Sequence, residues 1–207
     1  TGGMDTVAVR MPYHPIALDL IRRSGCLIAA PSANTSGRPS PTEAAHVAED
    51  LSGKIAMIID GGPVGIGIES TIIDLTEDTP MVLRPGYITP QMLSKVLGKE
   101  VIVDPGIIAA DDTRKPKAPG MKYKHYAPKA DMAIVDGTRK HVIAKINELV
   151  ASHRDDGKKI AVIATEETKQ FYDADVVLSM GSRADEDSIA HELYRILRDC
   201  DELDVDV

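Results

Sequence analysis

The sequence has no tryptophan, a single phenylalanine and only two cysteines among its 207 residues. Aromatic side chains form the stacking platforms of single-strand nucleic-acid binders, so their scarcity disfavours that class of protein. Cys26 and Cys200 lie at opposite ends of the chain, which excludes a disulfide framework and a cysteine-rich metal site. Cys26 falls in an apolar run typical of a buried strand. We therefore predict that both cysteines are buried, inert thiols.

The sequence also lacks a long apolar run. No stretch approaches the roughly 20 residues that a membrane-spanning helix needs. The first residues have neither the basic nor the apolar part of a signal peptide, so a cytoplasmic location is expected. With 43% apolar and 27% charged residues, the composition is that of a soluble globular protein that can bury real cores.

Acidic charge dominates the chain, except in one segment. The net charge of −8 argues against broad, non-specific binding to nucleic acid, so direct tRNA binding is not expected. Residues 1–112 contain 8 basic and 14 acidic side chains, and residues 131–207 contain 10 and 18. Residues 113–130 contain 6 basic side chains and none that is acidic. We predict two acidic domains joined by a basic, proline-rich linker.

The first domain shows alternating strand and helix patterns. Apolar and β-branched runs indicate strands, and runs with helical periodicity that end at glycine indicate helices. Gly25 and Gly98 serve as helix stops, Thr42 is the expected cap of one helix, and Thr89 caps another before Pro90. The strands are expected at 6–10, 26–30, 55–60, 71–75 and 81–84, and the helices at 14–24, 42–51 and 89–98.

The second domain has a more regular pattern, from residue 132 onward. It predicts a small βαβαβα unit with a parallel sheet, in other words a Rossmann-like domain. The strands are expected at 132–135, 160–164 and 176–178, and the longer helices at 138–152 and 185–199. The tail at 204–207 reads as a strand without a partner. Such apolar strands need neighbouring strands in a sheet, and the chain does not obviously supply them. The natural protein is therefore expected to extend further.

Two polar loops could carry chemistry. Residues 30–42 combine five hydroxyl side chains with Asn34, Arg38 and a glycine, directly after an expected strand. Such loops are where open α/β sheets bind ligands, and these donors suit a phosphate; a plain surface turn is an equal alternative. Residues 60–71 form a glycine-rich loop without the Gly-Lys-Ser/Thr ending, and a strand follows it. A nucleotide-binding P-loop is therefore not expected there.

Two further features lie at a strand end and in the linker. Arg84 ends an apolar strand, where it either points into the ligand region or is simply solvated. Residues 122–128 place two tyrosines, a histidine and two lysines in the linker, and these suit either a lid over a nucleotide or a basic strap between acidic domains. The remaining histidines have no metal-ligand spacing, so no dedicated metal site is expected.

Taken together, five motifs in order resemble the threonylcarbamoyl-AMP synthase family. The resemblance covers nearly the whole chain, since residues 131–207 resemble the extra C-terminal domain of the longer members. The motifs are Thr6-Val7-Ala8-Val9-Arg10, Pro31-Ser32-Ala33-Asn34 with Ser36-Gly37, Glu69-Ser70-Thr71, Leu83-Arg84-Pro85-Gly86, and residues 118–128.

This resemblance implies an α/β fold: part of a YrdC-like domain with a twisted, mixed sheet, a linker, and a small Rossmann-like domain. It implies a nucleotidyltransferase that makes threonylcarbamoyl-AMP and pyrophosphate from L-threonine, bicarbonate and ATP for the t6A modification of tRNA. No side-chain nucleophile is needed, and Mg²⁺ arrives with ATP. The site residues that it implies are Thr6, Ser32, Ser40, Arg84 and Tyr126 for ATP, Arg10, Ala30 and Ser70 for threonine, and Asn34 and His125 as secondary candidates.

The chain departs from the family pattern at its start. Family members begin with about a hundred further residues that include a Lys-x-Arg motif, the main cationic clamp on the triphosphate, which has no match here. We therefore expect that the 207 residues are a fragment of the enzyme and that this fragment is inactive or nearly so by itself. The product would pass to the tRNA-modifying machinery. A non-catalytic RNA- or nucleotide-binding module remains the alternative.

Overall fold

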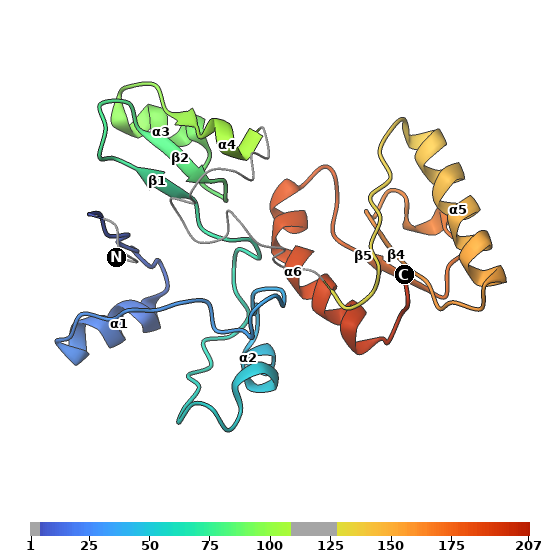
Figure 1. Ribbon diagram of the computed structural model, residues 1–207, viewed down its shortest axis with the longest axis horizontal. Coiled ribbons are helices and arrows are strands. Elements are labelled where there is room, and N and C mark those ends of the chain that lie inside the picture. The colour runs from blue at the N-terminus through green and yellow to red at the C-terminus, as the bar shows by residue number, and fades with distance from the viewer. Residues whose placement is uncertain (1–4, 109–127) are drawn as a thin grey trace. The chain divides into compact units, whose positions relative to one another are not determined.

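The computed structural model describes residues 5–108 and 128–207 (Figure 1). The chain forms two compact units, Thr1–Ser32 and Ala33–Val207, and each is described by itself. Among the described residues, the helices are all too short or too polar to cross a membrane.

Over residues 5–32, the described part of the first unit, one helix forms, α1 (Pro15–Ser24). Pro15 occupies the first helical position, and Gly25 ends the helix in the left-handed conformation with a φ of 63°. This helix confirms the sequence prediction. The strands expected at 6–10 and 26–30 are wrong, because neither run pairs with another in the described part of the chain. Cys26 is exposed rather than buried for the same reason.

The N-terminal part of the second unit contains a small mixed sheet. Its strands are β1 (Ile72–Asp74), β2 (Met81–Arg84) and β3 (Ile102–Val103), in the order β1-β2-β3. β1 and β2 are antiparallel, whereas β2 and β3 are parallel, so the mixed sheet expected from the resemblance is confirmed. β2 is the central strand and buries two residues, with Val82 fully enclosed. The strand expected at 55–60 is wrong, because that run joins no ladder.

The same part of the chain, residues 33–108, also contains three helices: α2 (Ala44–Leu51), α3 (Pro90–Leu97) and the short α4 (Pro105–Ile108). α3 is capped as predicted, because the Thr89 hydroxyl accepts a hydrogen bond from the Met92 N–H at 3.2 Å. The expected cap of α2 was wrong by one residue. Glu43 occupies the N-cap position, and the Thr42 N–H instead donates to His46 Nδ1 at 3.2 Å.

The C-terminal part of the second unit repeats strand and helix. Its elements are α5 (Arg139–Asp155), β4 (Ala161–Ala164), η1 (Lys169–Phe171), β5 (Val176–Ser179) and α6 (Glu186–Glu202). β4 and β5 are parallel, as predicted. Val150 of α5 packs on Ile160, Val162 and Ala164, and these four residues form a buried core. The strand expected at 132–135 is wrong.

The C-terminal tail does have a partner in the structure. The Asp206 N–H donates to the Lys159 carbonyl at 2.8 Å, and the Ala161 N–H donates to the Val207 carbonyl at 2.9 Å. The tail therefore lies beside the start of β4, whose hydrogen bonds on its other edge go to β5. The prediction of an unpartnered tail was wrong because pairing between segments this far apart leaves no local signal.

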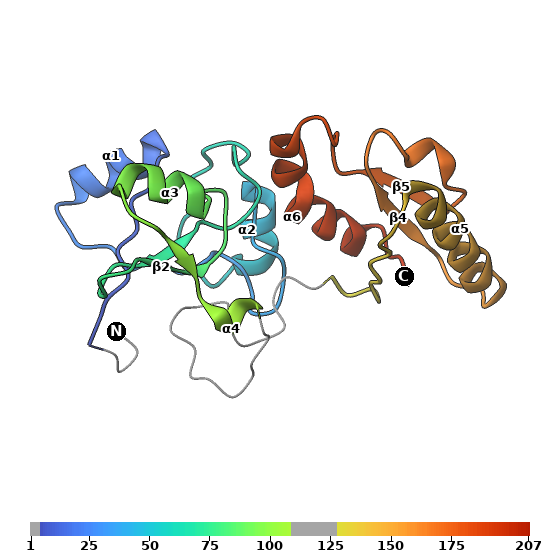
Figure 2. The same cartoon turned by 90° about the horizontal axis from the view of Figure 1, so that it is seen from above.

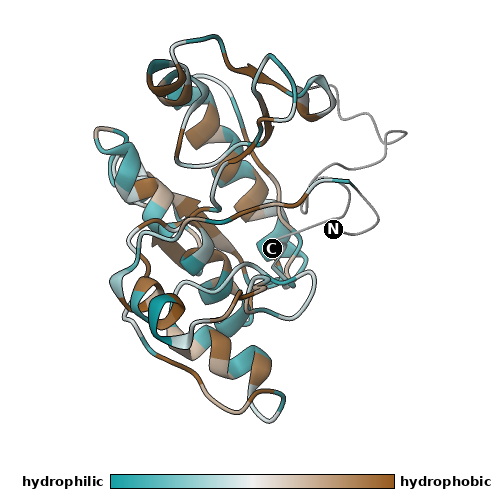
Figure 3. Ribbon diagram, turned by 90° about the vertical axis from the view of Figure 1, so that its left-hand side faces the viewer, coloured by the Kyte–Doolittle hydropathy of each residue, from teal (hydrophilic) through white to brown (hydrophobic). Residues whose placement is uncertain are grey.

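α6 is an amphipathic helix with one buried side. Its N-cap, Asp185, accepts a hydrogen bond from the Ser188 N–H at 3.3 Å. It buries Ile196, Leu197, Arg198 and Cys200, and the burial of Cys200 confirms that prediction. Brown apolar and teal polar stretches both occur along the helices (Figure 3). α6 lies beside α2 in both Figure 1 and Figure 2.

Candidate functional site

The register of the mixed sheet brings two of the implied site residues together. In the antiparallel pair of β1 and β2, Ile72 lies opposite Arg84. Ser70 is two residues before Ile72, so it is placed at the same end of the ladder as Arg84. The guanidinium of Arg84 donates to the Ser70 carbonyl from Nε at 3.2 Å and from Nη2 at 2.9 Å.

Gly86 allows two backbone segments to approach closely at this end of the sheet. A Cβ added there would stand 2.5 Å from the Thr71 amide nitrogen and 2.8 Å from the Ser70 carbonyl carbon. The Thr71 hydroxyl also donates to the Ile88 carbonyl at 2.6 Å. The segment after β2 therefore lies against the segment before β1, and only glycine allows so close an approach.

Glu69 completes the group. Its Oε2 atom forms an ion pair with Arg84 Nη1 at 2.8 Å, and its Oε1 atom accepts a hydrogen bond from the Ser40 hydroxyl at 3.2 Å. We call Ser40, Glu69, Ser70 and Arg84 the Glu69 cluster. It unites three residues that the resemblance implies, two for ATP and one for threonine, from three separate stretches of the sequence.

The charged side chains of the cluster are bonded to their neighbours and are partly exposed. The Arg84 and Glu69 side chains are 17% and 15% exposed. The guanidinium is fixed from two sides, by a carboxylate and by a backbone carbonyl, so its planar fork keeps one orientation. Such a fork suits a carboxylate or phosphate oxygen, and in this structure it binds the Glu69 carboxylate, to which the Ser40 hydroxyl also donates.

Asn34 lies in the loop that leads to Ser40. Its Nδ2 atom donates to the Thr35 carbonyl at 3.0 Å and to the Arg38 carbonyl at 3.1 Å, which closes the loop on itself. Its Oδ1 atom is buried and accepts no hydrogen bond within the described residues. A buried acceptor without a partner is uncommon in folded proteins. The secondary role that the resemblance implies for Asn34 stays a prediction.

Asp50 of α2 holds this loop through hydrogen bonds. Its Oδ2 atom accepts the Thr35 N–H at 2.9 Å, and its Oδ1 atom accepts from Arg38 Nη1 at 2.5 Å. Burial opposes the charge on Asp50, but the hydrogen bonds from Arg198 and the Thr35 N–H and the charge of Arg38 outweigh it. The pKa of Asp50 therefore lies below its ordinary value, and the carboxylate stays ionised.

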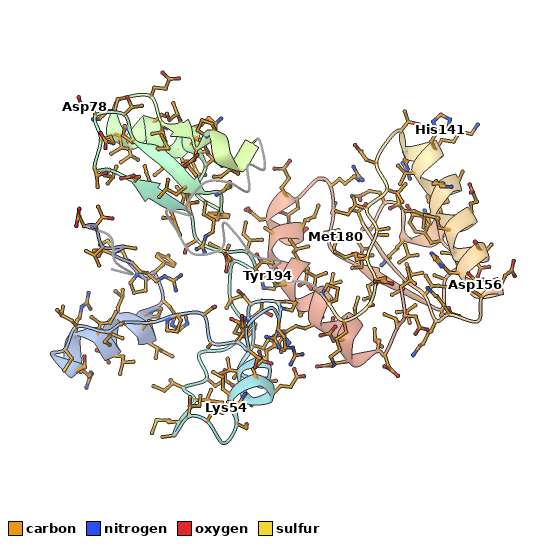
Figure 4. All side chains as sticks on the ribbon, viewed as in Figure 1. Lys54, Asp78, His141, Asp156, Met180 and Tyr194 are labelled. Carbon is orange, nitrogen blue, oxygen red and sulfur yellow. The ribbon has the colours of Figure 1, made fainter. Side chains whose placement is uncertain are left out.

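Tyr194 extends from α6 (Figure 4), and its hydroxyl is sensitive to the charges of Glu69 and Arg84. Burial and the negative charge of Glu69 together raise its pKa to about 12, against the opposing positive charge of Arg84. The sequence prediction missed Glu69, Asp50, Tyr194 and Arg198 as parts of the site. Glu69 stood inside a quoted motif, but nothing in the sequence marks the other three.

The remaining implied residues fall elsewhere. Thr6, Arg10, Ala30 and Ser32 belong to the unit Thr1–Ser32, in which all four are exposed. His125 and Tyr126, together with the lid expected for the linker, lie outside the described residues. Within the described residues, no group of three His, Cys, Asp or Glu side chains is arranged to hold a metal ion.

The glycine-rich loop of residues 60–71 is a connection into strand β1 and not a phosphate-binding loop. The Val64 N–H donates to the Thr42 carbonyl at 2.9 Å, and the Gly62 N–H donates to Asp60 Oδ1 at 2.8 Å. The loop leads into strand β1, and a P-loop would lead into a helix. The prediction that this loop is not a P-loop is therefore confirmed.

Folding stability is expected to fall as the pH drops below about 6.5, because of His46. Burial and the charge of Arg198 lower its pKa from 6.5, against smaller opposing effects of Glu43, Asp199 and Glu202. In the window between the two pKa values the unfolded chain binds more protons than the folded chain, so acidification favours unfolding. His46→Gln should flatten this part of a plot of unfolding free energy against pH, measured by urea denaturation. An unchanged slope would contradict the assignment.

Comparison with known proteins gives consistent matches. Residues 1–86 match the family model described as "Telomere recombination", and residues 88–207 match the one described as "Threonylcarbamoyl-AMP synthase, C-terminal domain". The threonylcarbamoyl-AMP synthase of Bacillus subtilis is 50% identical over 206 residues, and that of Pyrococcus abyssi is 52% identical over 208 residues. Each match covers 100% of this chain and 58% of the relative, so the chain spans little more than half the length of these relatives.

A solved structure agrees with the sequence matches. The crystal structure of P. abyssi Sua5 complexed with L-threonine aligns with a TM-score of 0.88 and 50% identity, over 100% of this chain and 58% of the other. The resemblance inferred from the motifs is thus confirmed. Because the C-terminal domain model by itself matches more than half of the chain, this chain belongs to the threonylcarbamoyl-AMP synthase family.

Proposed function

We propose that the full-length protein is an L-threonylcarbamoyladenylate synthase, which converts L-threonine, bicarbonate and ATP into threonylcarbamoyl-AMP and pyrophosphate. The observation that carries this proposal is the Glu69 cluster. It joins Ser40 and Arg84, which we assign to ATP, to Ser70, which we assign to threonine. The names of the relatives and the L-threonine bound to P. abyssi Sua5 support the same substrates.

The adjacency of the two assignments is what the reaction requires. Threonine's amine and bicarbonate give a carbamate with loss of water, and a carbamate oxygen attacks the α-phosphorus of ATP. A new P–O bond forms, the bond to the leaving pyrophosphate breaks, and the electron pair departs with pyrophosphate. Both substrates must meet at one place, so the protein's main work is alignment and charge neutralisation.

The other implied residues extend the two subsites. Thr6, Ser32 and Tyr126 would join the ATP subsite, and Arg10 and Ala30 the threonine subsite, where the Arg10 fork suits the amino acid's carboxylate. Asn34 and His125 stand beside them as secondary candidates. Mg²⁺ would come with the phosphates of ATP, because Mg²⁺ is usually held by substrate phosphates and few protein ligands.

The division of the chain follows from the same proposal. Residues 1–112 would form the C-terminal part of the catalytic domain, 113–130 the basic linker and lid, and 131–207 the Rossmann-like domain. We expect a cytoplasmic enzyme whose product passes to the tRNA-modifying transferase machinery. The separate sheets, β1-β2-β3 and β4-β5, support two domains on either side of the linker.

The test is the release of pyrophosphate by the full-length protein. We expect release that depends on both L-threonine and bicarbonate, with threonylcarbamoyl-AMP identified by mass spectrometry. ATP binding without such release would overturn the enzyme proposal and favour the nucleotide- or RNA-binding module. The 207 residues alone form a second sample, which we expect to be inactive or nearly so, because they contain no Lys-x-Arg clamp. Turnover at the full-length rate would refute that expectation.

Tyr126→Ala in the full-length protein is expected to weaken nucleotide binding or turnover by about 1–2 kcal/mol, the range of one aromatic or hydrogen-bond contact. Global folding should stay intact, because a linker tyrosine lies outside both predicted cores. Calorimetric titration with a non-hydrolysable ATP analogue measures the first effect, and thermal denaturation measures the second. A variant that unfolds while its affinity per folded molecule is unchanged would make Tyr126 a structural strap residue.

A further inference from the structure

We propose that Arg198 of α6 is a positioning residue for the ATP subsite, acting through the loop of residues 34–40. The C-terminal part of the chain would thus set the geometry of a site whose reacting groups lie elsewhere. This inference rests on the proposed function for the role of Ser40, but the contacts that carry it are independent of that function.

Arg198 is buried and directs its donors at one place. The residue is 1% exposed. Its Nη2 and Nε atoms donate to the Pro39 carbonyl at 2.7 Å and 3.1 Å. Nη2 also donates to Asp50 Oδ2 at 2.9 Å. The Arg198 guanidinium thus binds the loop backbone at Pro39 and the Asp50 carboxylate at the same time.

The loop is held on its other side by Asp50. The same carboxylate accepts the Thr35 N–H and a donor of Arg38, and the Asp50 carbonyl accepts from the Thr35 hydroxyl at 3.4 Å. The loop is therefore fixed at residues 35, 38 and 39. Ser40 comes next, and its hydroxyl reaches Glu69 at 3.2 Å. The contacts run without a gap from Arg198 through Pro39 and Ser40 to the Glu69 cluster.

Stability alone does not account for this arrangement. A buried ion pair gains little over an apolar pair of the same size, because both charges lose their hydration. The guanidinium instead fixes positions, because its directional hydrogen bonds fit only one placement of the Pro39 carbonyl and the Asp50 carboxylate. Pro39 is itself almost fully buried, so the loop cannot shift at this point without breaking these bonds.

The same helix also touches the other side of the site. A Cβ added at Gly67, in the glycine-rich loop before Glu69, would stand 2.5 Å from the His191 carbonyl carbon. Tyr194, one turn further along α6, is half-buried, and the charges of Glu69 and Arg84 act on its hydroxyl. α6 therefore contacts the loop before Glu69 as well as the loop before Ser40, and Arg198 binds the second of these through directional hydrogen bonds.

The test compares variants of the full-length protein. Arg198→Met should raise the KM for ATP about tenfold, the effect of losing one or two charge-assisted hydrogen bonds, while the KM for threonine changes less than twofold. Arg198→Lys keeps the charge but not the fork, so it should raise the KM for ATP about threefold. The matched control is Arg195→Met on the same helix, whose partners Glu192 and Asp199 are also in α6, and it should leave both constants unchanged.

A second readout needs no activity. Amide hydrogen exchange of residues 33–40 should be faster in Arg198→Met and Arg198→Lys than in the wild type or in Arg195→Met, because the Thr35 N–H depends on a held Asp50. If the wild type releases no pyrophosphate, the proposed function fails, but exchange still decides whether Arg198 holds the loop.

Two results would overturn the inference. One is a destabilised Arg198→Met protein with an unchanged KM for ATP and unchanged exchange at 33–40, which would make Arg198 a purely structural residue. If Arg198→Met does not fold, Arg198→Lys decides, and wild-type values for both KM and exchange in that variant would equally refute it.

Discussion

Replacement of Gly67 by alanine is expected to lower the free energy of unfolding by about 2–3 kcal/mol, the upper part of the range for overpacking a tight contact. The new Cβ would overlap the His191 carbonyl oxygen and stand 2.6 Å from the Ala190 carbonyl oxygen. These are backbone atoms of α6 and cannot rotate away as a side chain can. The glycine-rich loop or the helix must therefore move, and urea denaturation of the full-length protein measures the cost.

Gly65→Ala is the matched control within the same loop. A Cβ at Gly65 meets no atom within 4 Å, so this substitution should change stability by no more than about 0.5 kcal/mol. Both variants add one methyl group to one loop, and only Gly67 faces α6. Equal stabilities for the two variants would mean that the loop and the helix do not pack as described.

The helices could be predicted from the sequence because their signals are local. α1 and α3 begin with proline and end at glycine residues that adopt positive φ, at Gly25 and Gly98. α5 and α6 follow from apolar residues that recur on one face of the helix. Each of these signals lies within the element itself, so no distant part of the chain is needed to interpret it.

Strands were harder because they depend on neighbours. The runs 6–10, 26–30 and 55–60 have strand composition, yet side chains such as Val9 at 87% and Met57 at 75% exposure lie in the open, and the runs form no ladder. Conversely, β3 has two residues and gives no pattern, but β2 pairs with it. Composition alone therefore overestimates strands wherever no partner strand is hydrogen bonded alongside.

The site could be predicted in part, for a similar reason. Ser70 and Arg84 fell in quoted motifs and Ser40 in the polar loop of residues 30–42, so the resemblance could assign them, and strand register explains why Ser70 and Arg84 meet. The bond between Arg198 and Asp50 joins residues 148 positions apart. An arginine within an amphipathic helix looks like a solvated charge in the sequence. Its burial becomes visible only when α2 and α6 lie side by side.

Arg84→Met in the full-length protein is expected to lower kcat/KM for ATP about 100-fold, which corresponds to about 2.7 kcal/mol of transition-state stabilisation. The change removes the cation of the Glu69 cluster, together with its bonds to the Ser70 carbonyl. Glu69 then stays as a carboxylate without that counter-charge beside the entering phosphates. Steady-state release of pyrophosphate, with ATP and threonine varied separately, measures the loss.

Two further variants separate charge from geometry. Arg84→Lys restores the positive charge without the fork, so it should fall between the wild type and Arg84→Met. Arg154→Met removes an arginine of α5 that pairs with Asp173, and it should keep kcat/KM within about twofold because exposed ion pairs of this kind contribute little. If Arg84→Met keeps the wild-type kcat/KM for ATP, then Arg84 only fastens β1 to β2, and the ATP subsite must be sought away from the Glu69 cluster. If Arg84→Lys is as impaired as Arg84→Met, the orientation of the fork, and not its charge, is what the reaction needs.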